Sequence, residues 1–314
     1  MQIHKSVMLD RCITLLTPAI ERNSNPIVVD ATLGLGGHSK AILQKFPQVR
    51  IVGLDRDQNA MKLAKENLQD FSERITIIHA VYNEIPSVLD SLGFSKVDGI
   101  LFDLGVSSLQ LDEAERGFSY SQSAPLDMRM DQSESLSAAV IINTYSKGEL
   151  VRVLRNYGEE KFAARIADNI IKARNSGNLN NTTELADLVK ASIPAATRRT
   201  GGNPAKRTFQ ALRIEVNNEL KVLEAAIPAG LDRLAVGGRM VVMSFQSLED
   251  RIVKRFFAEA SESKSPRGLP IEMAEFAAKF NLVFRGSESA SETEIANNSR
   301  AQSVKLRAIE RIAA

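Results

Sequence analysis

One sequence feature constrains the fold of this chain most: a short apolar run that ends in an acid and leads into a glycine-rich turn. Residues 27–30 read Ile-Val-Val-Asp, and residues 34–37 read Gly-Leu-Gly-Gly ahead of helix-forming sequence. A second apolar run, residues 51–54, ends in Asp55. This order of strand, glycine loop, helix, strand and acid is the βαβ unit that holds a nucleoside cofactor at the carboxyl edge of a parallel sheet. The glycines let the backbone approach a ligand, and the Asp55 carboxylate can accept hydrogen bonds from both ribose hydroxyls.

Two classes of cofactor use this geometry, and the spacing of the glycines begins to separate them. The dinucleotide pattern requires Gly-x-Gly-x-x-Gly or Gly-x-Gly-x-x-Ala. The loop that starts at Gly34 instead supplies Gly36, Gly37 and then Ser39. That is a poor cradle for a pyrophosphate, whereas a looser loop suffices for S-adenosylmethionine, whose only anion is a carboxylate. The loop therefore favours a methyl donor, with a turn that binds nothing as the alternative.

The composition narrows the class of protein. The 314 residues predict one large or two medium domains, and the net charge of +2 neither requires nor excludes nucleic acid. The single cysteine, Cys12, excludes an intrachain disulfide, and the histidines at positions 4, 38 and 79 lie too far apart to suggest a zinc site. No apolar run has the length of a membrane span, and no signal segment is visible. We expect a cytoplasmic protein with no metal and no membrane partner.

Strand and helix signals alternate through the first third of the chain. Over residues 26–103 they follow βαβ order, and a fourth buried strand at residues 97–103 again ends in an acid. Residues 106–208 offer only polar loops and helical periodicity. Strand signal returns at residues 238–245, after a long helix expected over residues 209–234.

Two further strand candidates, residues 282–284 and 304–309, follow near the end of the chain. A terminal strand pair suits the methyltransferase sheet and argues against the dinucleotide fold, which continues with parallel strands. We therefore predict an α/β fold, a Rossmann-like S-adenosylmethionine-dependent methyltransferase sheet with a helical insertion domain after the fourth strand. Residues 1–105 and 209–314 are expected to form the methyltransferase domain, and residues 106–208 the insertion.

A polar segment, residues 103–112, follows the fourth strand. Ligands of open α/β sheets bind outside the carboxyl ends of the strands, so Asp103 is expected to face both the cofactor and the acceptor. Gly105 permits a tight exit from the strand, and Gln110 is close enough in sequence to fold back over the site. The alternative is a polar strand exit in which Asp103 caps a turn.

Several longer motifs make the prediction specific. They include Asp103-Leu-Gly-Val-Ser-Ser, Asp112-Glu-Ala-Glu-Arg-Gly-Phe-Ser, Pro125-Leu-Asp-Met-Arg-Met-Asp, Lys206-Arg-Thr-Phe-Gln-Ala-Leu-Arg-Ile and Ser244-Phe-Gln-Ser-Leu-Glu-Asp-Arg-Ile-Val-Lys. Together they resemble the ribosomal RNA small subunit methyltransferase H family, bacterial enzymes that methylate the exocyclic N4 of a cytosine in the decoding region of 16S rRNA. The resemblance runs from near His4 to residues 303–307, so it covers essentially the whole chain.

The resemblance implies S-adenosylmethionine as the cofactor and 16S rRNA, within the small ribosomal subunit, as the partner. The loop at Gly36 would hold the methionine part, Asp55 the ribose and Tyr82 the adenine, while Asp103 and Gln110 would complete the pocket. Asp103 would be the catalytic residue beside the sulfonium and the acceptor amine. The implied cofactor-binding residues are Gly36, Gly37, His38, Asp55, Tyr82, Asp103 and Gln110.

The chain departs from the family pattern at two positions. Gln246 stands where the family generally has His, and Asn203 precedes a proline where His is common. Neither position therefore carries an indispensable imidazole base.

Basic residues gather at the end of the insertion. Residues 196–213 contain no Asp or Glu, so their cations could follow a phosphate backbone, although a charge run is also typical of an ordinary solvated face. The candidate RNA-binding residues are Arg198, Arg199, Lys206, Arg207 and Arg213. The alternating segment Asp127 to Asp131 has two interpretations, strand-like packing with an Arg129 ion pair or a lining of the acceptor pocket.

Two other classes of protein stay open at this point. A nicotinamide-dependent dehydrogenase would need a catalytic His or a Tyr-Lys pair in the second half of the chain, and none is convincing. A ribosome-assembly factor without activity could keep the fold, but the intact Asp55, Asp103 and glycine loop argue against it.

Overall fold

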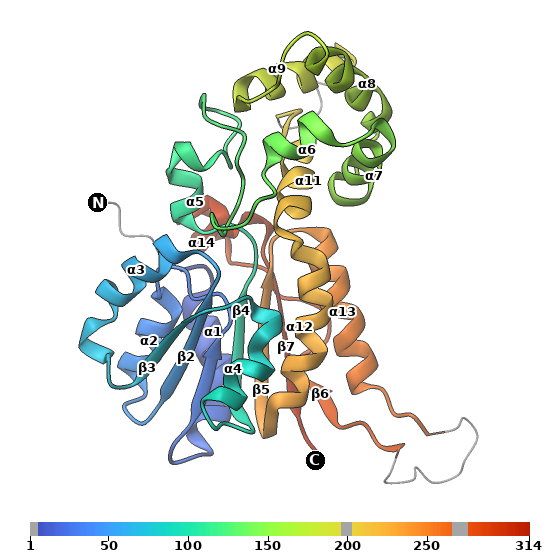
Figure 1. The fold of residues 1–314 in the computed structure, drawn as a ribbon. Coiled ribbons are helices and arrows are strands. Elements are labelled where there is room, and N and C mark those ends of the chain that lie inside the picture. The colour runs from blue at the N-terminus through green and yellow to red at the C-terminus, as the bar shows by residue number, and fades with distance from the viewer. Residues whose placement is uncertain (1–5, 196–202, 266–275) are drawn as a thin grey trace. The chain divides into compact units, whose positions relative to one another are not determined.

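The chain divides into two compact units. A computed structural model describes residues 6–195, 203–265 and 276–314 (Figure 1). One unit, the sheet unit, comprises Met1–Gly105 and Leu220–Ala314, and the other, the helical unit, comprises Val106–Glu219. Each unit has its own hydrophobic core.

A seven-stranded mixed sheet organises the described part of the sheet unit, in the order β3-β2-β1-β4-β5-β7-β6. The first five strands are parallel, and β7 pairs antiparallel with both β5 and β6. This order, with its antiparallel end, is the Rossmann-like methyltransferase sheet that the sequence predicted. The strands are β1 (Ile27–Asp30), β2 (Arg50–Asp55), β3 (Ile75–His79), β4 (Val97–Asp103), β5 (Leu234–Ser244), β6 (Phe280–Leu282) and β7 (Lys305–Arg311).

Helices cover both faces of this sheet (Figure 1). The pleat sends Val28 and Leu101 into one core layer and Val29 and Ile100 into the other, because successive strand residues point to opposite faces. The first layer packs against α1 (Leu9–Glu21), α2 (Gly37–Lys45) and α3 (Gln58–Asn67), and the second against α4 (Ile85–Ser91), α12 (Glu219–Arg233) and α13 (Ser247–Ser261). A short α14 (Glu292–Asn297) precedes β7.

The prediction of one long helix over residues 209–234 is wrong, because the structure has two helices there. Helix α11 (Lys206–Asn217) ends at Asn218, whose φ of 52° is left-handed, and α12 follows. Phe209 and Leu212 of α11 pack in the core of the helical unit, so this unit extends to Glu219 rather than to residue 208.

The helical unit contains, within its described residues, helices and loops with one isolated β-bridge between Pro125 and Asn181. Ser107, Ser146 and Asn181 cap helix N-termini with side chains that accept backbone N–H groups. The helices are α5 (Ser108–Asp112), α6 (Ala138–Thr144), α7 (Lys147–Gly158), α8 (Ala163–Arg174), α9 (Thr182–Ser192) and α11.

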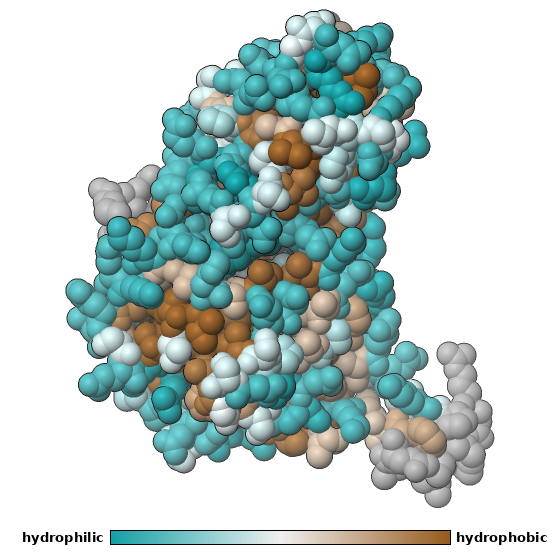
Figure 2. Space-filling view, in the orientation of Figure 1, coloured by the Kyte–Doolittle hydropathy of each residue, from teal (hydrophilic) through white to brown (hydrophobic). Residues whose placement is uncertain are grey.

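The visible face of the molecule is mostly hydrophilic, with smaller apolar areas (Figure 2). Across the described ranges, no helix combines the length and the apolar character that crossing a bilayer would require.

Candidate cofactor and active site

The glycine loop between β1 and α2 is shaped by left-handed backbone conformations. Gly34 has a φ of 52° and Gly36 a φ of 80°, a region that side chains with a Cβ rarely adopt. A Cβ on Gly36 would also lie 2.5 Å from Leu68 Cδ1. Gly36 precedes α2 and has no side chain to cap it, so the first N–H groups of α2 are left for an anionic ligand group.

Asp55, at the carboxyl end of β2, closes the other side of this loop. Its Oδ2 accepts the Gly34 N–H at 2.7 Å, and its Oδ1 accepts the Asp57 N–H at 2.8 Å. Burial raises the pKa of Asp55 to about 6, although these two hydrogen bonds favour the charged form. Each carboxylate oxygen keeps a lone pair, so both can still accept a ligand hydroxyl.

Asp30 was not among the predicted site residues, but it belongs to the same edge. It ends β1 and is buried, with Oδ2 accepting the Ser39 hydroxyl at 2.6 Å. Its charge raises the pKa values of both Asp55 and Asp103. The signal was present in the sequence, because Asp30 ends its strand just as Asp55 and Asp103 end theirs.

Asp103 ends β4, the strand beside β1, as expected. Its N–H donates to the Thr32 hydroxyl at 2.7 Å, which ties the end of β4 to the glycine loop. Burial raises the pKa of Asp103 to about 6; the nearby His38 lowers it and Asp30 raises it. The carboxylate is 29% exposed, and its Oδ2 lies 3.8 Å from His38 Nδ1.

Tyr82 lies in the 3₁₀ turn η2 (Tyr82–Glu84), three residues past the end of β3. Its ring meets Phe102 of β4 edge to face, with centroids 5.7 Å apart and an angle of 77° between the rings. The structure thus brings Tyr82 to the same sheet edge as Asp55, which ends the neighbouring strand β2.

Gln110 belongs to the helical unit rather than to the sheet edge. It lies in α5, is buried, and its Oε1 accepts the Ser107 N–H at 3.0 Å in a capping box. Its structural role is therefore to fix the start of α5.

The candidate RNA-binding residues have different surroundings. Arg213 forms a bidentate ion pair with the buried Glu219, with N···O distances of 2.8 and 2.9 Å. Lys206 and Arg207 are exposed at the start of α11, and Arg207 donates to the Glu159 carbonyl. Arg198 and Arg199 lie outside the described residues. The charge of Arg213 is thus matched within the protein, and its contact with RNA stays a prediction.

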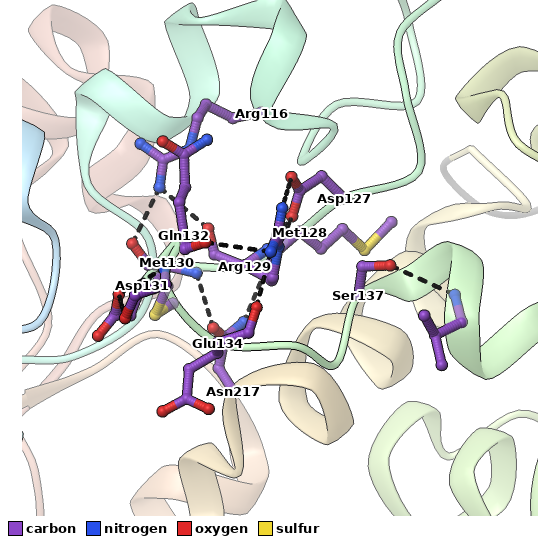
Figure 3. A network of polar contacts seen from close by, with 12 residues as sticks. Arg116, Asp127, Met128, Arg129, Met130, Asp131, Gln132, Glu134, Ser137 and Asn217 are labelled. Atoms are coloured by element: carbon purple, nitrogen blue, oxygen red, sulfur yellow. Dashed lines mark hydrogen bonds and ion pairs between the residues drawn. The ribbon is translucent and has the colours of Figure 1, made fainter.

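The segment from Asp127 to Asp131 is a loop, and the structure favours the ion-pair interpretation (Figure 3). The Arg129 guanidinium donates to both Asp127 oxygens, at 2.7 and 2.8 Å. Burial opposes ionisation of Asp127, but these hydrogen bonds lower its pKa overall. Met128 and Met130 lie in the core of the helical unit, so the alternation reflects packing in a loop rather than in a strand.

The two positions that depart from the family pattern both stand at helix starts. The Gln246 Nε2 donates to Glu249 Oε1 at 3.0 Å ahead of α13, and Asn203 Oδ1 accepts the Ala205 N–H at 2.9 Å ahead of α11. Among the residues with a described position, no group of three or more His, Cys, Asp or Glu is arranged to hold a metal ion.

The chain is similar to known proteins over nearly its whole length. Two relatives named ribosomal RNA small subunit methyltransferase H cover 98% of this chain: one from Streptomyces avermitilis is 55% identical over 97% of its own length, and one from Saccharopolyspora erythraea is 58% identical over 93%. Among solved structures, an rRNA methylase from Streptococcus thermophilus is 12% identical, covers 99% of both chains and has a TM-score of 0.45. An S-adenosylmethionine-dependent O-methyltransferase from Thermotoga maritima is 9% identical, covers 100% of this chain and 69% of its own, and has a TM-score of 0.40. Residues 1–312 match the MraW methylase family, and the chain belongs to this family.

Proposed function

We propose that the chain methylates the exocyclic N4 amine of a cytosine in the decoding region of 16S rRNA, with S-adenosylmethionine as the methyl donor. The chain is a methyltransferase by family, and its relatives are named for the RNA of the small ribosomal subunit. The observation that carries the proposal is the row of Asp30, Asp55 and Asp103 beside the glycine loop, at adjacent strand ends. We further infer that it is a cytoplasmic enzyme that acts on rRNA within the small subunit.

The residues at the sheet edge fit S-adenosylmethionine. A Cβ on Gly36 would clash with the Leu68 side chain, and the N–H groups of Gly37 and His38 at the start of α2 suit a carboxylate. Asp55 keeps lone pairs for the two ribose hydroxyls, and Tyr82 offers a ring edge or face to the adenine. Gln110 stays a predicted cofactor-binding residue.

Asp103 carries the proposed chemistry. The bound cofactor supplies a methyl group on a sulfonium, which needs no activation by the protein. An exocyclic base amine is a weak nucleophile because its lone pair is delocalised into the ring. By accepting a hydrogen bond from this amine, Asp103 orients it and takes up its proton as the new N–C bond forms. The target base must leave its stack to reach such a site, so an unpaired or opened strand is the substrate form.

Lys206 and Arg207 are the exposed described cations of the proposed RNA surface, and Arg198, Arg199 and Arg213 stay predicted members of it. Both Lys206 and Arg207 are exposed, and within the described ranges neither forms an ion pair with a carboxylate. Such cations bind a phosphate backbone without reading its sequence. Their role is therefore to position the RNA.

The decisive experiment is transfer of a labelled methyl group to purified small subunits, followed by mass spectrometry of the nucleosides. We expect N4-methylcytidine, and subunits with uridine at the target position should take up no label because uridine has no exocyclic amine. A methylated carbon or ribose oxygen would contradict the proposed acceptor, and no transfer at all would favour the assembly factor. Thermal stabilisation by NAD but not by S-adenosylmethionine would favour the dehydrogenase.

A further inference from the structure

We propose that His38 is a positioning residue whose imidazolium stabilises the charged form of Asp103 and so keeps this carboxylate ready to accept the proton of the substrate amine. The two groups face each other, with His38 Nδ1 3.8 Å from Asp103 Oδ2. Both belong to the sheet unit, one at the start of α2 and the other at the end of β4. The inference rests on the proposed methyl transfer to an amine and assigns His38 a role besides its backbone contact to the cofactor.

The second ring nitrogen of His38 fixes where its proton lies. His38 Nε2 is 3.1 Å from the Val7 carbonyl oxygen, which can only accept a hydrogen bond. Nε2 must therefore carry a proton. In the neutral imidazole this is its only proton, so the Nδ1 lone pair points toward the Asp103 carboxylate.

The contact is electrostatic, because 3.8 Å is too long for a hydrogen bond. A lone pair and a carboxylate that face each other repel, and a proton on Nδ1 turns this repulsion into attraction. The His38 side chain is only 7% exposed, so water does little to weaken the interaction. With the proton on Nδ1, the imidazolium stabilises an ionised Asp103.

The other charges near Asp103 do not replace this effect. Asp30 at the end of β1 raises its pKa, as burial also does. From α1, the Cys12 thiol faces the same carboxylates, and burial raises its pKa well above the usual value, so it stays neutral. Glu294 of α14 raises the pKa of Cys12 and, as an acid, does not favour a charged carboxylate nearby. Among the described residues, His38 is thus the group found to favour the charged form of Asp103.

The proton balance of the reaction follows from the pair. The amine nitrogen forms a bond to the methyl carbon while the S–C bond breaks, and the electron pair of that bond stays on sulfur. The amine then carries one proton too many, and this proton passes to Asp103. Asp103 returns it to water after the product leaves. No further reactant is needed.

The test separates the two ring nitrogens. In His38→Gln the side-chain amide takes the place of Nε2 and keeps a donor toward the Val7 carbonyl, but nothing replaces Nδ1. We measure the single-turnover rate of methyl transfer against pH at saturating S-adenosylmethionine. The acid limb should move up by about one pH unit, so the rate below about pH 6 should fall about tenfold while the high-pH plateau is kept. The control is His79→Gln, since His79 Nε2 likewise contacts a carbonyl, that of Arg56 at 3.0 Å, but is exposed.

Two readouts without catalysis complete the test. The carboxyl ¹³C signal of Asp103 should titrate near pH 6 in the wild-type protein and at higher pH in His38→Gln. Imidazole ¹⁵N spectra of the unmodified protein should show the neutral His38 protonated on Nε2. Neutral His38 protonated on Nδ1, or an Asp103 titration and pH profile that His38→Gln leaves in place, would overturn the inference. If the ¹³C titration moves as expected while even the wild-type protein transfers no methyl group, the pair stands and the proposed function fails.

Discussion

The ionised carboxylate of Asp55 is expected to reduce the stability of the protein without cofactor, because burial makes its ionisation costly. Burial raises its pKa from the ordinary 3.8 to about 6. The folded chain therefore holds a proton between these pH values that the unfolded chain has already released. By proton linkage the free energy of unfolding falls as the pH rises through this window, from a maximum below it. Asp55→Asn removes this loss, since an amide does not ionise.

The magnitude follows from the two pKa values. Complete ionisation of Asp55 costs the folded state roughly 3 kcal/mol relative to the unfolded chain. The amide has only one acceptor oxygen, so the variant also loses one of the hydrogen bonds from Gly34 and Asp57, at about 1 kcal/mol or more. That loss does not depend on pH. The difference in stability between variant and wild type should therefore shift in favour of Asp55→Asn by roughly 1.5 kcal/mol between about pH 5 and about pH 7.5.

Urea unfolding of the full chain at several pH values measures this difference, without cofactor. The control is Asp70→Asn, which removes an exposed carboxylate from the 3₁₀ turn η1 (Gln69–Phe71) of the same unit. A stability difference between Asp55→Asn and wild type that stays constant over this pH range would refute the reasoning. Calorimetry should in addition show that the variant binds S-adenosylmethionine about 1.5–3 kcal/mol more weakly, because the ribose loses a charged acceptor.

Three further predictions test the site and the RNA surface. Gly36→Ala should destabilise the protein by about 1–2 kcal/mol in thermal unfolding, because the φ of 80° is strained for alanine and its Cβ would displace the Leu68 side chain; Leu68→Ala should relieve only the second effect. Asp103→Ala should lower the single-turnover rate more than the cofactor affinity, and a rate fully restored by saturating cofactor would make Asp103 a binding residue only. Exchanging Lys206 and Arg207 together for Gln should reduce the slope of log K for RNA binding against log salt by roughly 0.7–0.9 per lost phosphate contact. The affinity for the cofactor should not change. If variant and wild type bind RNA equally at every salt concentration, the two residues belong to an ordinary solvated surface.

The sheet and its acids could be predicted because their signals are local. An apolar run that ends in Asp specifies the end of a strand, so the positions of Asp55 and Asp103 follow from the sequence. The glycines after the first such run specify the loop. The antiparallel end of the sheet followed from two late strand runs. The break at Asn218 was missed because the apolar pattern continues on both sides and a non-glycine residue takes the left-handed turn.

The contacts of the site residues are not local and could not be predicted in the same way. Arg213 looked free because no acid lies within residues 196–213, yet Glu219, just beyond, forms its ion pair. His38 and Asp103 are far apart in sequence and meet only because β1 and β4 are neighbours in the sheet. Gln110 was expected over the site because of its distance along the chain, and the capping box at α5 is a contact that this distance does not reveal.

The acids at the sheet edge should make cofactor binding release protons. Asp55 and Asp103 both have pKa values of about 6 in the free protein, so each is about half protonated at pH 6. Ribose hydroxyls that donate to Asp55 favour its charged form, and a sulfonium near Asp103 does the same. Binding at about pH 6 should thus release up to about one proton, and at about pH 8 almost none. Calorimetric titration in buffers of different ionisation enthalpy counts these protons. Asp55→Asn should halve the release, and S-adenosylhomocysteine, which has no sulfonium charge, should release fewer protons than S-adenosylmethionine. Equal release by both ligands would place the sulfonium away from Asp103 and would leave Asp55 as the carboxylate that senses the cofactor.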